Sequence, residues 1–159
     1  NLLLTEADLY IKLKRMDKFG ELMEEAVKLD PDNPILFYNL GVVNANQNKI
    51  NEAMAYYKKA IELKPDYADA HINLAAAILG GEKAIVEEMN NNLSNDKKYD
   101  ELEQKQKNLY REALPYLEKA DELKRSLDTV RSLLNIYDIL EMEEKADKLR
   151  PIYKEMRQG

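Results

Sequence analysis

Residues 34–67, PILFYNLGVVNANQNKINEAMAYYKKAIELKPDY, place large and small apolar side chains at the spacing of two packed helices. Two bulky residues and a small one recur on one face of a first helix, and small residues let a second helix lie close against it. Pro65 ends the second helix, because it lacks an N–H group for the helical ladder and disfavours the helical conformation in the preceding residue. The residues that carry this pattern are Phe37, Leu40, Gly41, Ala53, Tyr57 and Ala60.

Copies of this pattern lie on both sides of it. Residues 1–33 end in EEAVKLDPDN but carry Phe19 where a small residue is expected, and a third copy begins at 68 with Leu74, one full period after Leu40. The unit resembles the tetratricopeptide repeat, whose period is about 34 residues. The resemblance implies an all-α fold, a right-handed solenoid of about four helical hairpins in a single domain, 1–159. The expected repeats are 1–33, 34–67, 68–126 and a terminal repeat, 127–159, with Pro151 inside its second helix.

The third repeat is longer than the others. In the second repeat the small residue Ala53 follows Leu40 after a short interval, and the same interval after Leu74 would place a small residue at position 87. The small residue that matches is instead Ala113. Relative to the regular period, the third hairpin therefore contains an insertion of about 26 residues.

Apolar residues keep helical spacing through this insertion, which predicts that both helices of the third hairpin are lengthened into a two-helix projection at about 81–108. Gly80 and Gly81 weaken the first helix by ~1 kcal/mol each relative to Ala, so we expect a kink there. The helices meet at a polar tip, NNNLSND (90–96), where Ser94, Asn95 or Asp96 caps the returning helix. The apolar residues are Ile78, Ile85, Met89, Tyr99, Leu102 and Leu109.

Residues 67–157 also resemble a narrower group, bacterial repeat proteins whose last repeats include such a lengthened hairpin. This resemblance implies the C-terminal part of a larger, envelope-associated bacterial protein, and it favours the periplasm or cell envelope over the cytoplasm. The chain begins at Asn1 rather than at an initiator Met, so we expect a native N-terminus to have been removed.

The resemblance implies that the first helix of each hairpin lines a concave groove that binds a protein or peptide. Asn39 and Asn73 lie one period apart in this groove, and because an amide both donates and accepts, a ladder of them can satisfy the backbone of an extended peptide. The alternative is that Asn is simply common at this position of the repeat. The candidate partner-binding residues are Tyr38, Asn39, Val42, Asn46, Ile72, Asn73, Ala76, Arg131 and Asn135.

One activity of the family is disfavoured by the residues. Members that bind the C-terminal carboxylates of chaperones use Lys, Arg and Asn at five groove positions, which form a carboxylate clamp. The residues at these positions are Leu4, Asp8, Asn39, Asp69 and Asn73, so only one matches. The sequence therefore predicts that the chain does not bind through such a clamp.

Other functional classes find little support. The net charge of −6 repels nucleic acid, and the longest apolar run, residues 74–79, is far shorter than the ~20 residues of a membrane span. There is no Cys, a single His and no Gly-rich phosphate loop, so we expect no enzymatic activity, catalytic residue, cofactor or metal. His71 is expected to be a packed core residue.

The sequence thus favours a monomeric interaction scaffold that binds a peptide or partner helix in the groove. Two alternatives remain. The chain is a structural or self-associating module that uses the long hairpin, or it is an accessory domain of a larger enzyme.

Overall fold

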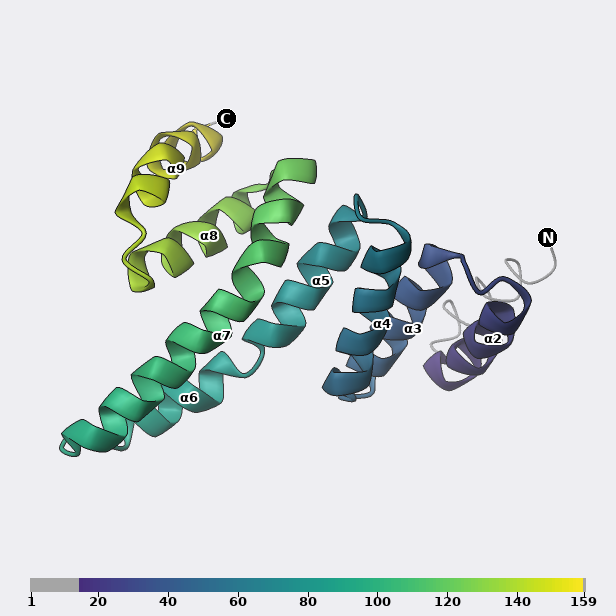
Figure 1. Cartoon of the computed structure of the whole chain (residues 1–159), viewed down its shortest axis with the longest axis horizontal. Helices are drawn as coiled ribbons and strands as arrows, with labels where there is room; N and C mark the ends of the chain where they lie inside the picture. Colours follow the sequence, from purple (N-terminus) through teal and green to yellow (C-terminus); the bar gives the residue numbers. More distant parts are fainter. Residues whose placement is uncertain (1–14, 159) are drawn as a thin grey trace. The chain divides into compact units, whose positions relative to one another are not determined.

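The computed structural model describes residues 15–158 of the 159-residue chain. The regular structure of these residues is entirely α-helical (Figure 1). They fall into two compact units, one ending at Ala70 and the other beginning at His71. The helices are α2 (Met16–Leu29), α3 (Pro34–Asn46), α4 (Ile50–Leu63), α5 (Ala68–Leu79), α6 (Glu82–Asn90), α7 (Asp96–Leu123), α8 (Leu127–Ile139) and α9 (Glu143–Met156).

Helices α3 and α4 form the hairpin expected for residues 34–67, and local chemistry sets its ends. The Asn33 side chain accepts a hydrogen bond from the Ile35 N–H group at 3.1 Å, which caps α3. Asn48, in the connection, adopts a left-handed φ of 61°, a conformation that Asn tolerates. Lys64 is non-helical at φ −140° and ψ 87°, as expected for a residue before proline, so α4 ends at Leu63.

At Gly41, the ring of Tyr57 from α4 lies directly against the backbone of α3. A β-carbon added there would overlap the ring of Tyr57, which is itself buried at 2% exposure. Ala53 and Ala60 are fully buried on the facing side of α4. The small residues therefore perform the packing role that the repeat pattern predicted.

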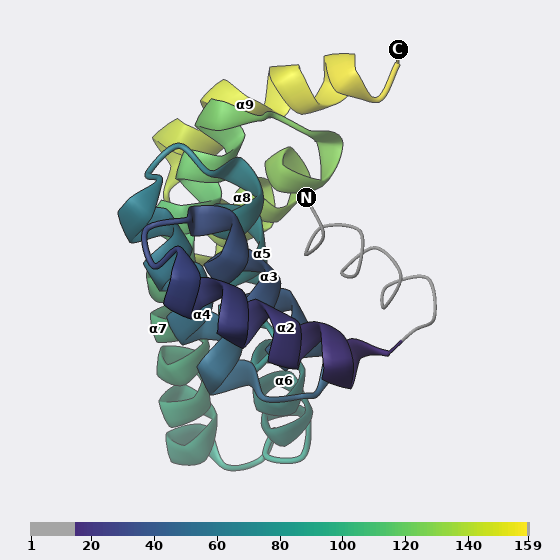
Figure 2. The ribbon, with the colours of Figure 1, turned by 90° about the vertical axis from the view of Figure 1, so that its right-hand side faces the viewer.

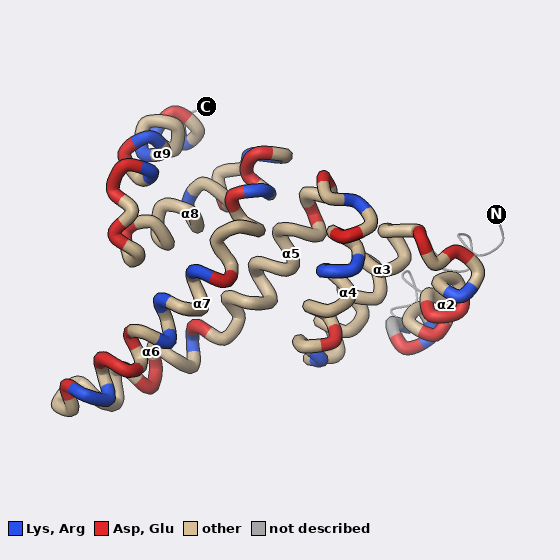
Figure 3. The backbone as a smooth tube through the Cα atoms, in the orientation of Figure 1, with Lys and Arg blue, Asp and Glu red and all other residues tan. Residues whose placement is uncertain are grey.

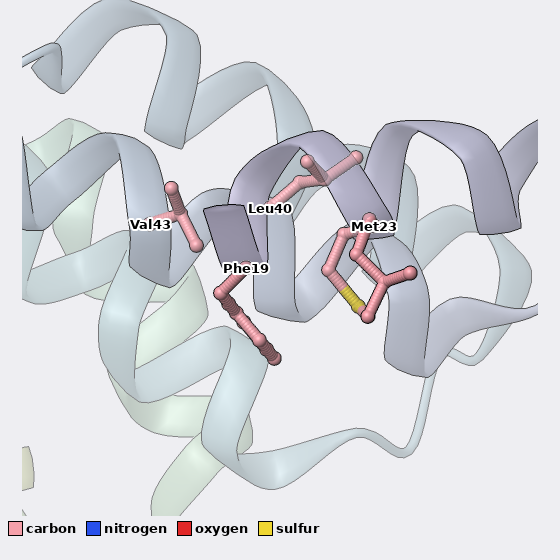
Figure 4. Close-up of a cluster of buried hydrophobic side chains, with 5 residues drawn as sticks. Phe19, Met23, Leu40 and Val43 are labelled. Carbon is pink, nitrogen blue, oxygen red and sulfur yellow. The ribbon is translucent and has the colours of Figure 1, made fainter. Parts of the chain in front are cut away.

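Helix α2 packs against α3 through larger side chains. Phe19 and Met23 of α2 contact Leu40 and Val43 of α3 in one buried cluster (Figure 4). Phe19 stands where the repeat expects a small residue and is only 4% exposed, so it fills this interface. The first helix expected for repeat 1–33 lies outside the described residues.

The second unit contains the inserted segment, and its first arm differs from expectation. Helix α5 ends at Leu79, Gly80 and Gly81 form a turn, and the separate helix α6 begins at Glu82. The prediction of one lengthened, kinked helix was therefore wrong for this arm. Two adjacent glycines weaken helix propagation enough to interrupt the helix altogether.

The returning arm is a single helix of 28 residues, α7, as expected. Figures 1 and 2 show α6 beside the first part of α7, running away from α8 and α9, so residues 81–108 do form a two-helix projection. Its interior is a small cluster of Ile85, Met89 and Leu102. Asn95 caps α7 by accepting from the Lys98 N–H group at 3.2 Å, which confirms one of the three predicted caps.

The turn between α7 and α8 is fixed by a buried polar network. Asp121 is 6% exposed and accepts hydrogen bonds from Thr129 at 3.0 Å and from Arg125 at 2.8 Å. Ser126 and Thr129 form a reciprocal capping box at the start of α8. The charge of Asp121 is thereby compensated, as a buried carboxylate requires.

We expect Gly41→Ala to destabilise the protein by about 1–3 kcal/mol, because the added methyl group overlaps the Tyr57 ring. Gly81→Ala is the matched control, since its β-carbon lies 3.8 Å from the nearest atom in ordinary contact. This control should stabilise the protein by up to about 1 kcal/mol through reduced entropy of the unfolded chain. Urea unfolding followed by circular dichroism measures both, and equal effects would show that the α3–α4 packing is wrongly assigned.

Excision of residues 83–108 should leave a folded helical protein of similar stability. The cut removes most of the projection's own apolar cluster and restores between Leu74 and Ala113 the same interval that separates Leu40 from Ala53. Gly80 and Gly81 then lie in the new connection, where their freedom is favourable. The melting temperature and sedimentation of the shortened chain test this, and aggregation would mean that the projection belongs to the core.

Candidate protein-interaction surface

The first helices of the hairpins carry far fewer charges than the second ones. Helix α3 has no charged residue and α5 has only Asp69. Figure 3 shows both tubes almost uniformly tan, whereas blue and red segments recur along α2, α7 and α9. A surface without charges loses little hydration free energy when a neutral partner covers it.

Helix α3 presents its predicted binding residues on one face. Ile35 is 55% exposed and Asn46 is also exposed, while Tyr38, Asn39 and Val42 are half-buried. We call these five residues the α3 surface. Spacings of three and four residues bring them together along the helix.

The ring of Tyr38 is held in place by two other tyrosines. Its centroid lies 6.0 Å from that of Tyr57 and 5.0 Å from that of Tyr67, with both pairs tilted. Such aromatic pairs contribute about 0.5–1.5 kcal/mol beyond the area they bury. Tyr38 is thus a rigid aromatic side chain of the kind that dominates binding interfaces.

Sequence reasoning missed Tyr67 as a member of this cluster. It directly precedes α5, and Lys64 lies over its ring, 5.4 Å from the centroid. Burial raises the pKa of the Tyr67 phenol above its ordinary value. The sequence feature that could have singled out Tyr67 is its position, because it lies one repeat period after Asn33, the residue that caps α3.

Among the described residues, the side-chain amide nitrogen of Asn39 contacts only a weak acceptor. Its Nδ2 atom lies 3.9 Å from the sulfur of Met23 on α2. A thioether is a poor acceptor compared with a carbonyl oxygen. The donor is therefore available to a better acceptor on a bound chain.

The predicted residues of α5 and α8 lie in the second unit. Ile72 and Asn73 are half-buried and Ala76 is exposed on α5. A joint groove that includes both units stays a prediction. So does the ladder of Asn39 with Asn73.

Arg131 and Asn135, on α8, are already engaged by neighbouring side chains. Arg131 donates to Asp128 at 2.7 Å on the surface, and Asn135 hydrogen-bonds the phenol of Tyr110. Both α8 residues are exposed, but any partner must compete with these interactions.

Tyr110 lies at the centre of a polar cluster at the base of the projection. Its hydroxyl donates to the Glu82 carboxylate and accepts from Gln106 at 3.3 Å. The Tyr137 hydroxyl similarly donates to Glu118 at 2.8 Å. Burial and the adjacent carboxylate raise the pKa of both phenols.

Among the described residues, no group of three or more His, Cys, Asp or Glu side chains is placed to hold a metal ion. His71 is 5% exposed and lies against Tyr116, with ring centroids 6.1 Å apart, as predicted for a packed residue. Within the same part of the chain, no helix has the length and apolar content of a membrane span.

Comparisons with known proteins agree with the repeat pattern. Residues 1–33 and 34–67 each match a family model described as tetratricopeptide repeat. A peroxisomal targeting signal receptor of Saccharomyces cerevisiae is 34% identical over 61 residues, which make up 38% of this chain and 10% of that protein. The chain thus spans about a tenth of the length of this relative. The relative is a yeast protein, so a bacterial envelope origin gains no support from it and stays a prediction.

Two solved structures share the fold at low identity. MamA AMB-1 aligns with a TM-score of 0.66 and 20% identity, covering 99% of this chain and 72% of that chain. The first repeat domain of Spaghetti (RPAP3), bound to the HSP90 peptide SRMEEVD, aligns with a TM-score of 0.62 and 19% identity, covering 88% of this chain and 94% of that one. These likenesses confirm the predicted all-α tetratricopeptide-repeat fold.

The second structure also conflicts with an expectation from the sequence. A domain of the same fold binds an acidic chaperone peptide, so the exclusion of such peptides does not stand as a finding. The two clamp positions Leu4 and Asp8 lie outside the described residues. Asp69 and Asn73 stand at positions where clamp proteins carry cations.

The raised pKa values of Tyr110 and Tyr137 predict how stability depends on alkaline pH. The folded state holds both phenolic protons more tightly, so this stabilisation is fully present below the pKa of an unfolded tyrosine, about 10. It is lost as the pH rises from there through the higher pKa of the folded state. Relative to a Tyr110→Phe, Tyr137→Phe double variant, the wild type should lose about 1 kcal/mol per tyrosine by about pH 11. Urea unfolding at several pH values tests this, and parallel pH profiles would contradict it.

Proposed function

Because the chain carries tetratricopeptide repeats, we propose that it is a non-catalytic scaffold that binds a peptide or partner helix on its first helices. The observation that supports the proposal is the α3 surface, which combines an uncharged helix, an exposed Ile35 and the rigid Tyr38 ring. The other predicted binding residues lie in the second unit and form a separate candidate surface there: Ile72, Asn73, Ala76, Arg131 and Asn135.

The chemistry of the α3 surface favours a neutral apolar segment. Burial of Ile35 and Val42 by a ligand yields roughly 25 cal/mol per Å² of apolar surface removed from water. An acidic ligand would leave its carboxylates without partners on α3, since this helix has no cation. The amides of Asn39 and Asn46 supply the polar contacts that fix a peptide's orientation.

The projection offers a second candidate surface. Leu93 at its tip is 68% exposed and Val86 on α6 is 37% exposed, so a second copy or another protein could bury them. This alternative places the partner on residues that differ completely from the α3 surface. Variants of the two surfaces therefore separate the hypotheses.

The proposal is tested by selecting peptides from a displayed library and measuring their Kd by fluorescence anisotropy. Selected peptides should be neutral and apolar, and Tyr38→Ala should weaken them at least about tenfold, since aromatic hot spots contribute about 2 kcal/mol or more. The exposed Lys58→Ala on α4 is the control and should leave Kd unchanged. Affinity should vary little with salt, because the contacts carry no charge.

Two further arms locate the site. Asn39→Ala and Asn73→Ala, made singly and together, should weaken binding if both units contact one ligand, and a silent Asn73→Ala would restrict the site to α3. SRMEEVD is the acidic competitor, and if it binds more tightly than neutral peptides, the chain is an acidic-tail receptor instead. Loss of binding in Leu93→Asn but not in Tyr38→Ala would move the site to the projection.

A further inference from the structure

The second unit contains a cleft lined by residues of α7, α8 and α9 and of the turn that follows α7. Its volume is about 300 Å³, which lies at the small end of the range for ligand pockets in proteins. The apolar part of its lining consists of Leu133 on α8 and Leu149 on α9, which are 2% and 7% exposed, together with the half-buried Ile152. The cleft shares no residue with the α3 surface or with the predicted groove residues.

The wall on α7 carries two carboxylates, and each is already paired with a cation. Glu118 accepts hydrogen bonds from Lys145 at 2.6 Å and from the Tyr137 hydroxyl at 2.8 Å. Asp121 accepts from Arg125 at 2.8 Å. The charges of both carboxylates are thereby compensated within the lining itself.

Lys148 is the third cation of the lining, and it has no such compensation. Among the described residues, it takes part in no ion pair. Spacings of three and four residues along α9 place it on the same face as Lys145 and Ile152. With three cations and two carboxylates, the lining carries a net charge of +1.

The charge of the cleft and its apolar surface together indicate what it can hold. A lysine in open water needs no partner, but Lys148 borders a cavity whose walls include Leu133 and Leu149. A ligand can therefore transfer an apolar group out of water while its anionic group pairs with the ammonium. One negative charge matches the net charge of the lining, whereas a second would find no free cation there.

We propose that this cleft binds a small carboxylic acid with one branched apolar group, about the size of a single amino-acid residue. Lys148 pairs with its carboxylate, and Leu133, Leu149 and Ile152 contact its apolar group. A free acid and the last residue of a peptide chain share this chemistry. The site is separate from the proposed peptide-binding surface and goes beyond that function.

The experiment titrates the full chain with four probes and follows the backbone amide signals by two-dimensional NMR. The probes are isocaproate, its neutral amide, acetate, and a capped Ala-Ala-Leu peptide with a free C-terminal carboxylate. Isocaproate should shift the signals of Leu149 and Ile152. It should bind at least about fivefold more tightly than its amide, which lacks the charge, and than acetate, which lacks the apolar group.

Lys148→Met tests the ion pair, because it keeps the apolar stem of the side chain and removes the ammonium group. It should weaken isocaproate at least about fivefold and leave the amide unchanged, while Lys148→Arg should retain binding. Lys154→Met is the matched control, since this exposed lysine lies on the same helix outside the cleft. Its loss of one charge should leave the Kd unchanged.

The outcomes are distinct. Equal binding of isocaproate and its amide, an unchanged Kd in Lys148→Met, or amide shifts confined to residues outside the cleft would each overturn the inference. Tighter binding of the peptide than of isocaproate would support a chain end as the ligand, and the reverse would support a free acid. Tyr38→Ala should affect none of these affinities, so the failure of this site and that of the α3 surface are observed separately.

Discussion

The close approach of α3 to α4 at Gly41 is the contact on which the first unit depends. Tyr57 occupies the space that a side chain at position 41 would take, and it is buried there at 2% exposure. Because Tyr57 is fixed, Tyr38 packs beside it, and Tyr67 in turn packs beside Tyr38. A packing constraint inside the hairpin thus sets the position of Tyr38, the aromatic residue of the α3 surface.

The second unit carries a long projection, and the contacts that stabilise this projection are largely its own. The interior of the projection is its own apolar cluster, while its base is held by the hydrogen bond from Tyr110 to Glu82. The double glycine separates α5 from α6, so the geometry of the repeat need not continue into the insertion. Long insertions that pack on themselves cost little stability, which explains why one is tolerated here.

Charge is divided between the two kinds of helix, and this division bears on recognition. The second helices carry many of the ion pairs found among the described residues and interact with water, whereas α3 is uncharged. Exposed ion pairs of this kind contribute little to stability. Their placement instead leaves the first helices as the surface where a neutral partner loses least on desolvation.

The sequence by itself determined the helices, their pairing and the insertion, because those features follow from local periodicity and from small residues at fixed offsets such as Gly41 and Ala60. It also predicted the packed state of His71 and a cap at Ser94, Asn95 or Asp96, of which the structure selects Asn95. It did not predict that the helix is interrupted at Gly80 and Gly81. That outcome depends on whether the free-energy cost of two glycines exceeds the gain from continuing the helix. It missed Tyr67 because stacking on Tyr38 joins residues far apart in the chain. Only the tertiary structure decided which half-buried side chains pair, since contacts between distant residues depend on the path of the whole hairpin rather than on any local pattern.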